Sequence, residues 1–138
     1  MTRVLAIDDD DMTRQFVTSV LEPAGYEVRT ASGGVPGLQQ ATASPPDVVL
    51  LDVQMPDLDG YEVCRRLRQS AQTRNIPVIM LTASEDPKLN HLAYEAGAQA
   101  CVPKPFRREA LIATIEVVRT STPRDKAGGI SGGTSGGR

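Results

Sequence analysis

The sequence predicts a doubly wound α/β domain, in which a five-stranded parallel sheet is covered by helices on both faces. Short apolar runs alternate with amphipathic segments along the chain, and this alternation is typical of parallel strands joined by right-handed crossover helices. Most of the apolar runs also lack a regularly alternating polar residue, as expected for strands that helices bury from both sides.

Five runs are interpreted as the strands of this sheet. The most apolar of them are residues 3–7 (RVLAI), 47–51 (DVVLL), 77–81 (PVIML) and 100–102 (ACV). A more polar run, residues 27–31 (EVRTA), follows Gly25 and Tyr26 and completes the set. Each run is followed by a segment with helical periodicity, so strand and helix alternate along the whole domain.

Apolar residues recur with helical spacing in the segments between the strands. Four sets are expected to face the sheet: Met12, Phe16, Val17, Val20 and Leu21; Gly60, Val63, Cys64 and Leu67; Leu89, Leu92, Ala93 and Ala96; and Leu111, Ile115 and Val118 with Phe106 and Ala110. A further helix is expected over residues 35–43. Asp59 is the expected N-cap of the helix that follows it. Gly25 and Gly97 stand where helix C-terminal turns are expected.

The composition is that of one globular domain. The chain has 138 residues, of which 40% are hydrophobic and 23% charged, enough for a single core. We assign residues 1–120 to this domain and the Gly/Ser-rich residues 121–138 to a flexible tail or linker. Cys64 and Cys101 lack CxxC spacing, which argues against a disulfide framework or a zinc site, and both are expected to be reduced core residues.

Charge and hydropathy exclude several classes of partner. A net charge of −2 provides no bulk attraction for nucleic acid or a membrane surface. No long uncharged apolar run predicts a transmembrane helix, and the acidic N-terminus does not resemble a signal peptide. We therefore expect a cytoplasmic protein that contacts neither nucleic acid nor membrane directly.

Polar residues stand where the predicted strands end. Asp8 and Asp9 follow the first strand, Asp52 the third, Thr82 the fourth and Lys104 the fifth. In open α/β sheets, ligands bind outside the carboxyl ends of the strands, at the point where the strand order reverses. If the order is 2-1-3-4-5, the first and third strands are neighbours. Their aspartates then share one shallow pocket, flanked by Thr82 and Lys104.

Carboxylates gathered in this way raise one another's pKa unless a cation neutralises them. Oxygen ligands on a partly open site suit Mg²⁺, which keeps several of its waters. The charge of Lys104 and the hydroxyl of Thr82 form a cradle for a phosphoryl group, and one carboxylate could act as the nucleophile that forms an acyl phosphate. The pattern therefore predicts a Mg²⁺-dependent phosphoryl-transfer site.

In these residues the chain resembles the CheY-like receiver domain of two-component response regulators, from about residue 2 to residue 119. The resemblance is carried, in chain order and at strand ends, by DD (Asp8 and Asp9), DVQMPDLDG (52–60), PVIMLTA (77–83) and KPF (104–106). It implies a flavodoxin-like (βα)₅ fold with strand order 2-1-3-4-5.

The resemblance also implies the roles of the acidic residues. Asp52 would be the phosphoacceptor. Asp9 would bind Mg²⁺ directly and Asp8 partly through water, with Asp52 and the backbone carbonyl of Gln54 as the other protein ligands.

Further roles follow from the same resemblance for the residues on the last two strands. Thr82 would hydrogen-bond the phosphoryl group, Lys104 would pair with it, and the small Ala83 would leave room for it. The peptide bond between Lys104 and Pro105 is commonly cis in this family, and X-Pro bonds tolerate that isomer, so a cis bond is expected here.

Two departures from the family pattern affect the expected switch. The family usually carries an aromatic residue or histidine three residues before the lysine, and this side chain turns inward when the threonine moves. Cys101 stands there, so the aromatic part of the switch with Thr82 is missing. Gln54 and Ser84 would flank the path of the attacking water and tune the lifetime of the phosphoryl group.

Asp10 and Asp11 receive a different interpretation from Asp8 and Asp9. Acidic residues are favoured at the start of a helix by its dipole, so we expect Asp10 and Asp11 to begin the next helix rather than to bind metal. Arg107 and Arg108 are expected on a solvated surface, in a region that belongs to the partner-facing surface of receivers.

Two other functions fit parts of the sequence. The spacing of Asp9, Asp11 and Thr13 matches the DxDxT pattern of haloacid-dehalogenase-type Mg²⁺ phosphatases, although no suitable acidic pair follows Lys104. A receiver-like scaffold that no longer accepts phosphate is the other alternative, although all the expected pocket residues are present.

The favoured hypothesis is a receiver that takes a phosphoryl group from a histidine kinase or phosphotransfer protein onto Asp52. Transfer and dephosphorylation would be self-catalysed, so the chain is not expected to be an enzyme in the usual sense. Phosphorylation would change a protein-binding face that docks a downstream effector or a C-terminal output domain, and it could promote dimerisation.

Overall fold

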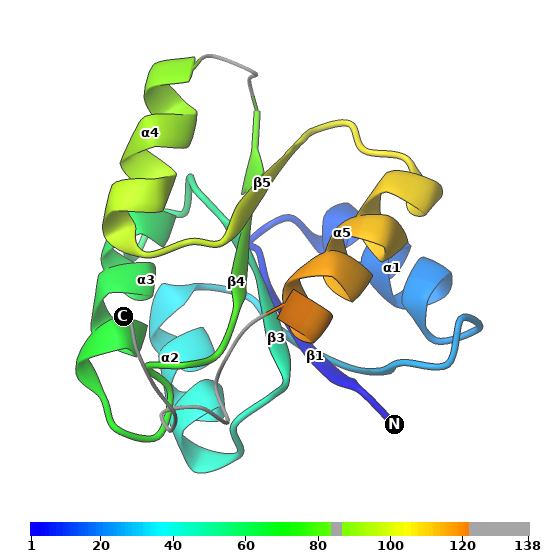
Figure 1. Cartoon of the computed structure of the whole chain (residues 1–138), viewed down its shortest axis with the longest axis horizontal. Helices are drawn as coiled ribbons and strands as arrows, with labels where there is room; N and C mark the ends of the chain where they lie inside the picture. The colour runs from blue at the N-terminus through cyan, green and yellow to red at the C-terminus, as the bar shows by residue number, and fades with distance from the viewer. Residues whose placement is uncertain (84–86, 122–138) are drawn as a thin grey trace.

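The computed structural model describes residues 1–83 and 87–121, where five strands and five helices alternate (Figure 1). The strands are β1 (Arg3–Ile7), β2 (Glu27–Ala31), β3 (Val48–Asp52), β4 (Val78–Thr82) and β5 (Ala100–Pro103). The helices are α1 (Asp11–Leu21), α2 (Gly34–Ala43), α3 (Gly60–Gln69), α4 (Pro87–Ala96) and α5 (Arg108–Ser121). Residues 122–138, most of the expected tail, and Ser84 lie outside the described residues.

The strands form one parallel sheet in the order β2-β1-β3-β4-β5, which confirms the predicted topology. Helices cover both faces: α1 and α5 lie on one side of the sheet in Figure 1, and α2, α3 and α4 lie on the other. Two apolar cores follow from this arrangement. Alternate residues of each strand enter opposite cores, as for Ile7 and Leu51 on one side and Ala6 and Leu50 on the other.

The register brings the carboxyl ends of four strands to one edge of the sheet. Ile7 pairs with Leu51, so the aspartates after β1 lie beside the end of β3. Asp52 pairs with Leu81, and Thr82 pairs with Pro103. The predicted strands 3–7 and 27–31 match those observed, whereas β3 and β4 begin and end one residue later than predicted and β5 extends to Pro103.

Most of the predicted helix faces are buried, but four residues are corrected. Met12, Phe16 and Leu92 are 75%, 41% and 45% exposed, and Ala110 is also exposed. The first turns of α1 lie beside the β5–α5 loop, where Phe16 contacts Phe106 with ring centroids 5.6 Å apart. In α4, the small Ala93 and Ala96 provide the buried stripe, and Leu92 falls outside it.

Local signals at helix ends act as predicted. The Asp59 carboxylate caps α3 by accepting a hydrogen bond from the Glu62 N–H at 2.9 Å. Gly25 and Gly97 have φ angles of 98° and 110°, a left-handed conformation that glycine adopts without steric cost. The helix expected over residues 35–43 is present as α2 and begins one residue earlier.

Gly60 is a point of close backbone approach between α3 and the end of β3. A Cβ atom on Gly60 would lie 2.3 Å from the Asp52 carbonyl oxygen and 2.9 Å from the Val53 Cα. Both neighbours are backbone atoms, so no side-chain rotation relieves the overlap.

We predict that Gly60→Ala lowers the free energy of unfolding by about 2 kcal/mol, since α3 must move away from β3 to admit the methyl group. Urea unfolding measures this change. Gln69→Ala, at the exposed far end of α3, is the control and should stay within about 0.5 kcal/mol of the parent protein. Equal stability of the two variants would contradict the close approach.

Candidate functional site

Three carboxylates meet at the carboxyl edge of the sheet. Asp8 and Asp9 follow β1, and Asp52 ends β3; each offers a carboxylate oxygen, and these oxygens lie within 4.8 Å of one another. Asp8 and Asp52 are buried, with exposed fractions of 1% and 7%, whereas Asp9 is exposed. The cluster therefore has a buried floor and one side open to solvent.

Lys104 is the cation that faces these carboxylates. Its Nζ lies 3.0 Å from Asp8 Oδ2 and 3.2 Å from Asp52 Oδ1. A backbone hydrogen bond positions this residue, because the Lys104 N–H donates to the Thr82 carbonyl at 2.6 Å. The peptide bond from Lys104 to Pro105 is cis, in keeping with the expected isomer.

Several hydrogen bonds hold Asp8 in place. Its Oδ1 accepts a hydrogen bond from the Asp10 N–H at 2.9 Å, and its own N–H donates to the Ala31 carbonyl at 3.1 Å. The Arg14 guanidinium donates to the Asp8 carbonyl at 2.7 Å and pairs with Asp11 at 3.0 Å. Sequence reasoning missed Arg14, although its position three residues after Asp11 on a helix permits that ion pair.

The charges of the cluster do not balance. Burial, followed by the negative charge of Asp8, raises the pKa of Asp52 to about 6, although Lys104 opposes this shift. Burial would lower the pKa of Lys104, but its hydrogen bond to Asp8 and the charge of Asp52 outweigh burial and raise it. Lys104 thus stays protonated, while one ammonium group only partly compensates the carboxylates around it.

The run of four aspartates divides after Asp9, as predicted. Asp10 is the N-cap of α1: its carboxylate accepts from the Met12 N–H and from the Thr13 hydroxyl at 2.7 Å, and the hydroxyl bond lowers the pKa of Asp10. Asp11 begins the helix and is exposed. Neither belongs to the cluster of three carboxylates.

Other predicted residues line the same open pocket. It includes Thr82 at the end of β4, Ala83 directly after it and Gln54 after β3. Tyr61 and Leu89 also line it, although sequence reasoning did not assign either of them to the site. Thr82 is buried, with 1% of its surface exposed. The pocket is therefore built from the ends of β1, β3 and β4 and from the loop after β5.

Cys101 lies apart from this pocket. It is half-buried in β5 and packs against the core shared with α3 and α4. The hydroxyl of Tyr94 on α4 hydrogen-bonds its sulfur, and burial raises the pKa of the thiol. Cys64 is fully buried, and both cysteines are free thiols.

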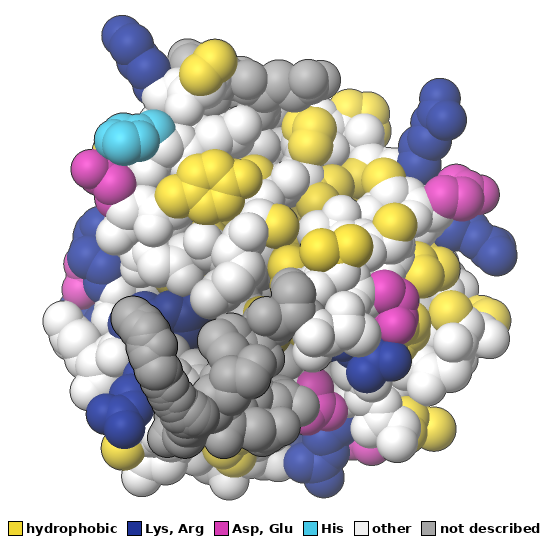
Figure 2. Space-filling view, in the orientation of Figure 1, with side chains coloured by type: hydrophobic (Ala, Val, Ile, Leu, Met, Phe, Trp, Pro, Cys, Tyr) yellow, Lys and Arg dark blue, Asp and Glu magenta, His cyan; other side chains and the backbone are white. Residues whose placement is uncertain are grey.

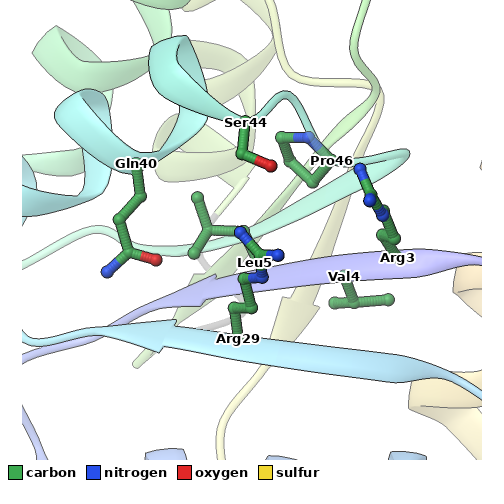
Figure 3. Close-up of a pocket in the computed structure, with 7 residues that line it drawn as sticks. All are labelled: Arg3, Val4, Leu5, Arg29, Gln40, Ser44 and Pro46. Carbon is green, nitrogen blue, oxygen red and sulfur yellow. The ribbon is translucent and has the colours of Figure 1, made fainter.

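A second cavity lies at the opposite end of the sheet. Figure 3 shows Arg3 and Leu5 of β1 and Arg29 of β2 near the end of α2 and the loop after it, and Val4 of β1 also lines the cavity. Its volume is about 10 Å³, about the space of one water molecule. That is too small for a phosphoryl group, so the acidic pocket remains the candidate site.

Comparison with known proteins identifies the family. A family model described as response regulator receiver domain matches residues 4–116. The chain belongs to this receiver family. The haloacid-dehalogenase alternative is therefore set aside, in agreement with the position of Asp11 outside the acidic cluster.

Individual relatives agree with this assignment. The chain is 39% identical to the response regulator MprA of Mycobacterium leprae over 125 residues, covering 91% of this chain and 54% of that protein. It is 38% identical to the DNA-binding dual master transcriptional regulator RpaA of Synechocystis over 124 residues, covering 90% of this chain and 52% of that protein. The chain thus spans about half the length of these curated relatives.

Solved structures of similar length match almost completely. The chemotaxis response regulator CheY4 of Vibrio cholerae has a TM-score of 0.82 at 37% identity, with 86% of this chain and 98% of that chain covered. A receiver domain protein of Clostridium thermocellum has a TM-score of 0.80 at 32% identity, with 92% and 98% covered. Among the described residues of the receiver, no helix combines the length and apolarity needed to cross a bilayer.

The acidic residues of the receiver fit a divalent cation. Asp8, Asp9 and Asp52 supply the hard carboxylate oxygens that Mg²⁺ prefers, on a site open enough for the ion to keep several waters. Three carboxylates face the one ammonium group of Lys104, which leaves an excess of negative charge. Burial, and after it the charge of Asp8, raises the pKa of Asp52. A dication would remove this excess, and the triad is typical of a receiver Mg²⁺ site.

We predict that Asp52→Asn stabilises the metal-free receiver at neutral pH by about 1–3 kcal/mol. The carboxyl ionises near pH 3.8 when unfolded and near 6 when folded. Between these values the native state alone holds the proton, so the stability of the parent protein falls as the pH rises from about 4 to about 6.

Urea unfolding in a chelator at several pH values tests this prediction. The advantage of Asp52→Asn should disappear below about pH 4, where Asp52 is protonated in both states. Asp11→Asn, outside the cluster, should show no such gain. Lower stability of Asp52→Asn at neutral pH would contradict the raised pKa of Asp52.

Proposed function

We propose that Asp52 accepts a phosphoryl group from a histidine kinase or a phosphotransfer protein. The observation that carries this proposal is the position of the Asp52 carboxylate, 3.2 Å from the Lys104 ammonium and within 4.8 Å of the Asp8 and Asp9 carboxylates. A nucleophile, a fixed cation and a cluster of metal-binding oxygens thus face one pocket open to solvent.

The transfer is a displacement at phosphorus. An Asp52 carboxylate oxygen forms a bond to phosphorus while the bond to the donor's imidazole nitrogen breaks, and the nitrogen keeps the electron pair. Mg²⁺ held by Asp8, Asp9, Asp52 and the Gln54 carbonyl would supply positive charge for the phosphoryl oxygens.

Residues at the ends of β4 and β5 would contact the incoming group. Lys104 would turn its ammonium from Asp52 to a phosphoryl oxygen, and the Thr82 hydroxyl would donate to another. Ala83 lines the pocket and its single methyl group leaves space above Asp52. Hydrolysis by water returns the carboxylate, so transfer and dephosphorylation are self-catalysed. Gln54 would border the path of that water, together with Ser84, which is outside the described residues.

The switch would reach the α4–β5–α5 face. Figure 2 shows hydrophobic side chains gathered across the region of α4, β5 and α5. Leu92 and Tyr94 on α4 and Val117 on α5 are 45%, 52% and 63% exposed, an apolar surface suited to a protein partner. Movement of Thr82 toward the phosphoryl group would alter this face, with Cys101 and its Tyr94 partner in place of an aromatic switch residue.

The partner at that face would be an effector protein, an output domain or a second receiver. Residues 1–120 would act as the receiver unit. Residues 121–138 would act as a tail or linker, and the Gly/Ser-rich composition of this segment supports that role. The receiver would act in the cytoplasm, where Cys64 and Cys101 stay reduced. Its net charge of −2 provides no bulk attraction for nucleic acid or a membrane surface, so it would contact neither directly.

We predict that acetyl phosphate with Mg²⁺ places one hydroxylamine-sensitive phosphoryl group on the receiver. Asp52→Asn should abolish it, because the amide is not a nucleophile, whereas Asp11→Asn should retain it. Intact mass spectrometry before and after hydroxylamine measures both.

Two outcomes would contradict the proposal. Phosphorylation that persists in Asp52→Asn would place the acceptor elsewhere. An unphosphorylated parent protein whose pocket amides do not respond to Mg²⁺ and beryllofluoride would favour the scaffold alternative.

A further inference from the structure

Helix α2 begins without a cap of its own. Its N-cap is Gly33, which has no side chain to accept a hydrogen bond, and its first turn carries no acidic residue. The first N–H groups of a helix have no partner within the helix, so α2 needs an acceptor from elsewhere.

Asp57 provides this acceptor from the loop between β3 and α3. Its Oδ1 accepts from the Gly34 N–H at 3.1 Å and its Oδ2 from the Val35 N–H at 2.9 Å. These backbone hydrogen bonds lower the pKa of Asp57. A single carboxylate thus caps a helix that begins more than 20 residues before it, and it is favoured there by the helix dipole.

The two glycines make room for this contact. A Cβ atom on Gly33 would lie 3.0 Å from both carboxylate oxygens of Asp57. A Cβ atom on Gly34 would lie 2.8 Å from the Leu58 Cβ and from a methyl group of Val63. The start of α2 therefore packs directly on the loop that carries Asp57 and on the start of α3.

The same loop forms one wall of the acidic pocket through Val53, Gln54, Met55, Pro56 and Asp59. Its ends are held by backbone bonds, from the Val53 N–H to the Leu81 carbonyl at 3.3 Å and from the Gly60 N–H to the Val53 carbonyl at 2.8 Å. Between these ends, Met55 is buried and Asp57 bonds α2. Asp57 itself does not line the pocket.

We propose that Asp57 is a positioning residue for the metal site: by bonding α2, its carboxylate holds the β3–α3 loop so that the Gln54 carbonyl can bind the cation. This inference rests on the proposed function. Mg²⁺ demands near-ideal ligand geometry, and residues that orient metal ligands commonly change affinity by tenfold or more when removed.

Asp57→Ala removes both acceptor oxygens and should raise the Kd for Mg²⁺ about tenfold. It should also lower the Tm and speed hydrogen exchange at the Gly34 and Val35 amides. Tyrosine fluorescence reports Mg²⁺ binding, because Tyr61 lines the pocket and the chain has no Trp. Asp57→Asn keeps one acceptor oxygen and should fall between Asp57→Ala and the parent protein.

A double variant separates loop positioning from helix stability. Gly33 has φ −176° and ψ 176°, an extended backbone that serine adopts readily as an N-cap. Loss of the Asp57 carboxylate also removes the atoms nearest to a Cβ on residue 33. Gly33→Ser combined with Asp57→Ala should therefore restore the Tm and the protection of the α2 amides, while the Kd for Mg²⁺ stays about tenfold raised.

The outcomes are distinguishable. An unchanged Kd in Asp57→Ala, or a double variant that recovers Mg²⁺ affinity together with the Tm, would overturn the positioning role while leaving the proposed function intact. A parent protein that binds no Mg²⁺ would overturn both.

Discussion

The ion pairs from Lys104 to Asp8 and Asp52 are the contacts on which the rest of the site depends. Two buried carboxylates at the end of adjacent strands would repel each other and lose hydration, and one ammonium group at 3.0 and 3.2 Å offsets part of that cost. The offset is incomplete, as the pKa of Asp52 near 6 indicates. The receiver thus keeps an excess of negative charge where a cation can reach it, and this excess favours metal binding over a closed, self-neutralised core.

The strand order makes this concentration of charge unavoidable. Because β1 and β3 are neighbours, the aspartates that follow one lie beside the aspartate that ends the other, although more than 40 residues separate them in the chain. Strands β4 and β5 extend the same parallel sheet, so Thr82 at the end of β4 and Lys104 after β5 lie at the same edge. Sequence reasoning could predict this edge because each of its residues follows from a local pattern. An apolar run predicts a strand, and the polar residue at its carboxyl end is a candidate site residue.

What could not be predicted depends on contacts between distant segments. Helical periodicity identified the stripe containing Val17 and Leu21, but it could not show that the first turn of α1 lies beside the β5–α5 loop and leaves Met12 exposed. The bond from Arg14 to the Asp8 carbonyl depends on the direction in which α1 leaves β1. The contact between Tyr94 and Cys101 likewise requires the packing of α4 on β5, which no local pattern specifies.

The cap of α2 shows how such a distant contact can serve the site. Considered alone, the glycines at the start of α2 destabilise the helix. Glycine loses more backbone conformational entropy on folding than other residues, and it has no side chain to accept a hydrogen bond from the first N–H groups. In the fold they admit the Asp57 carboxylate, so the same bonds that satisfy α2 also hold the loop beside Gln54. A serine or aspartate at position 33 could cap the helix alone, and the loop would then lack its two hydrogen bonds to α2. Because the acceptor for the α2 N-terminus comes from the loop that lines the acidic pocket, the stability of α2 is linked to the geometry of that pocket.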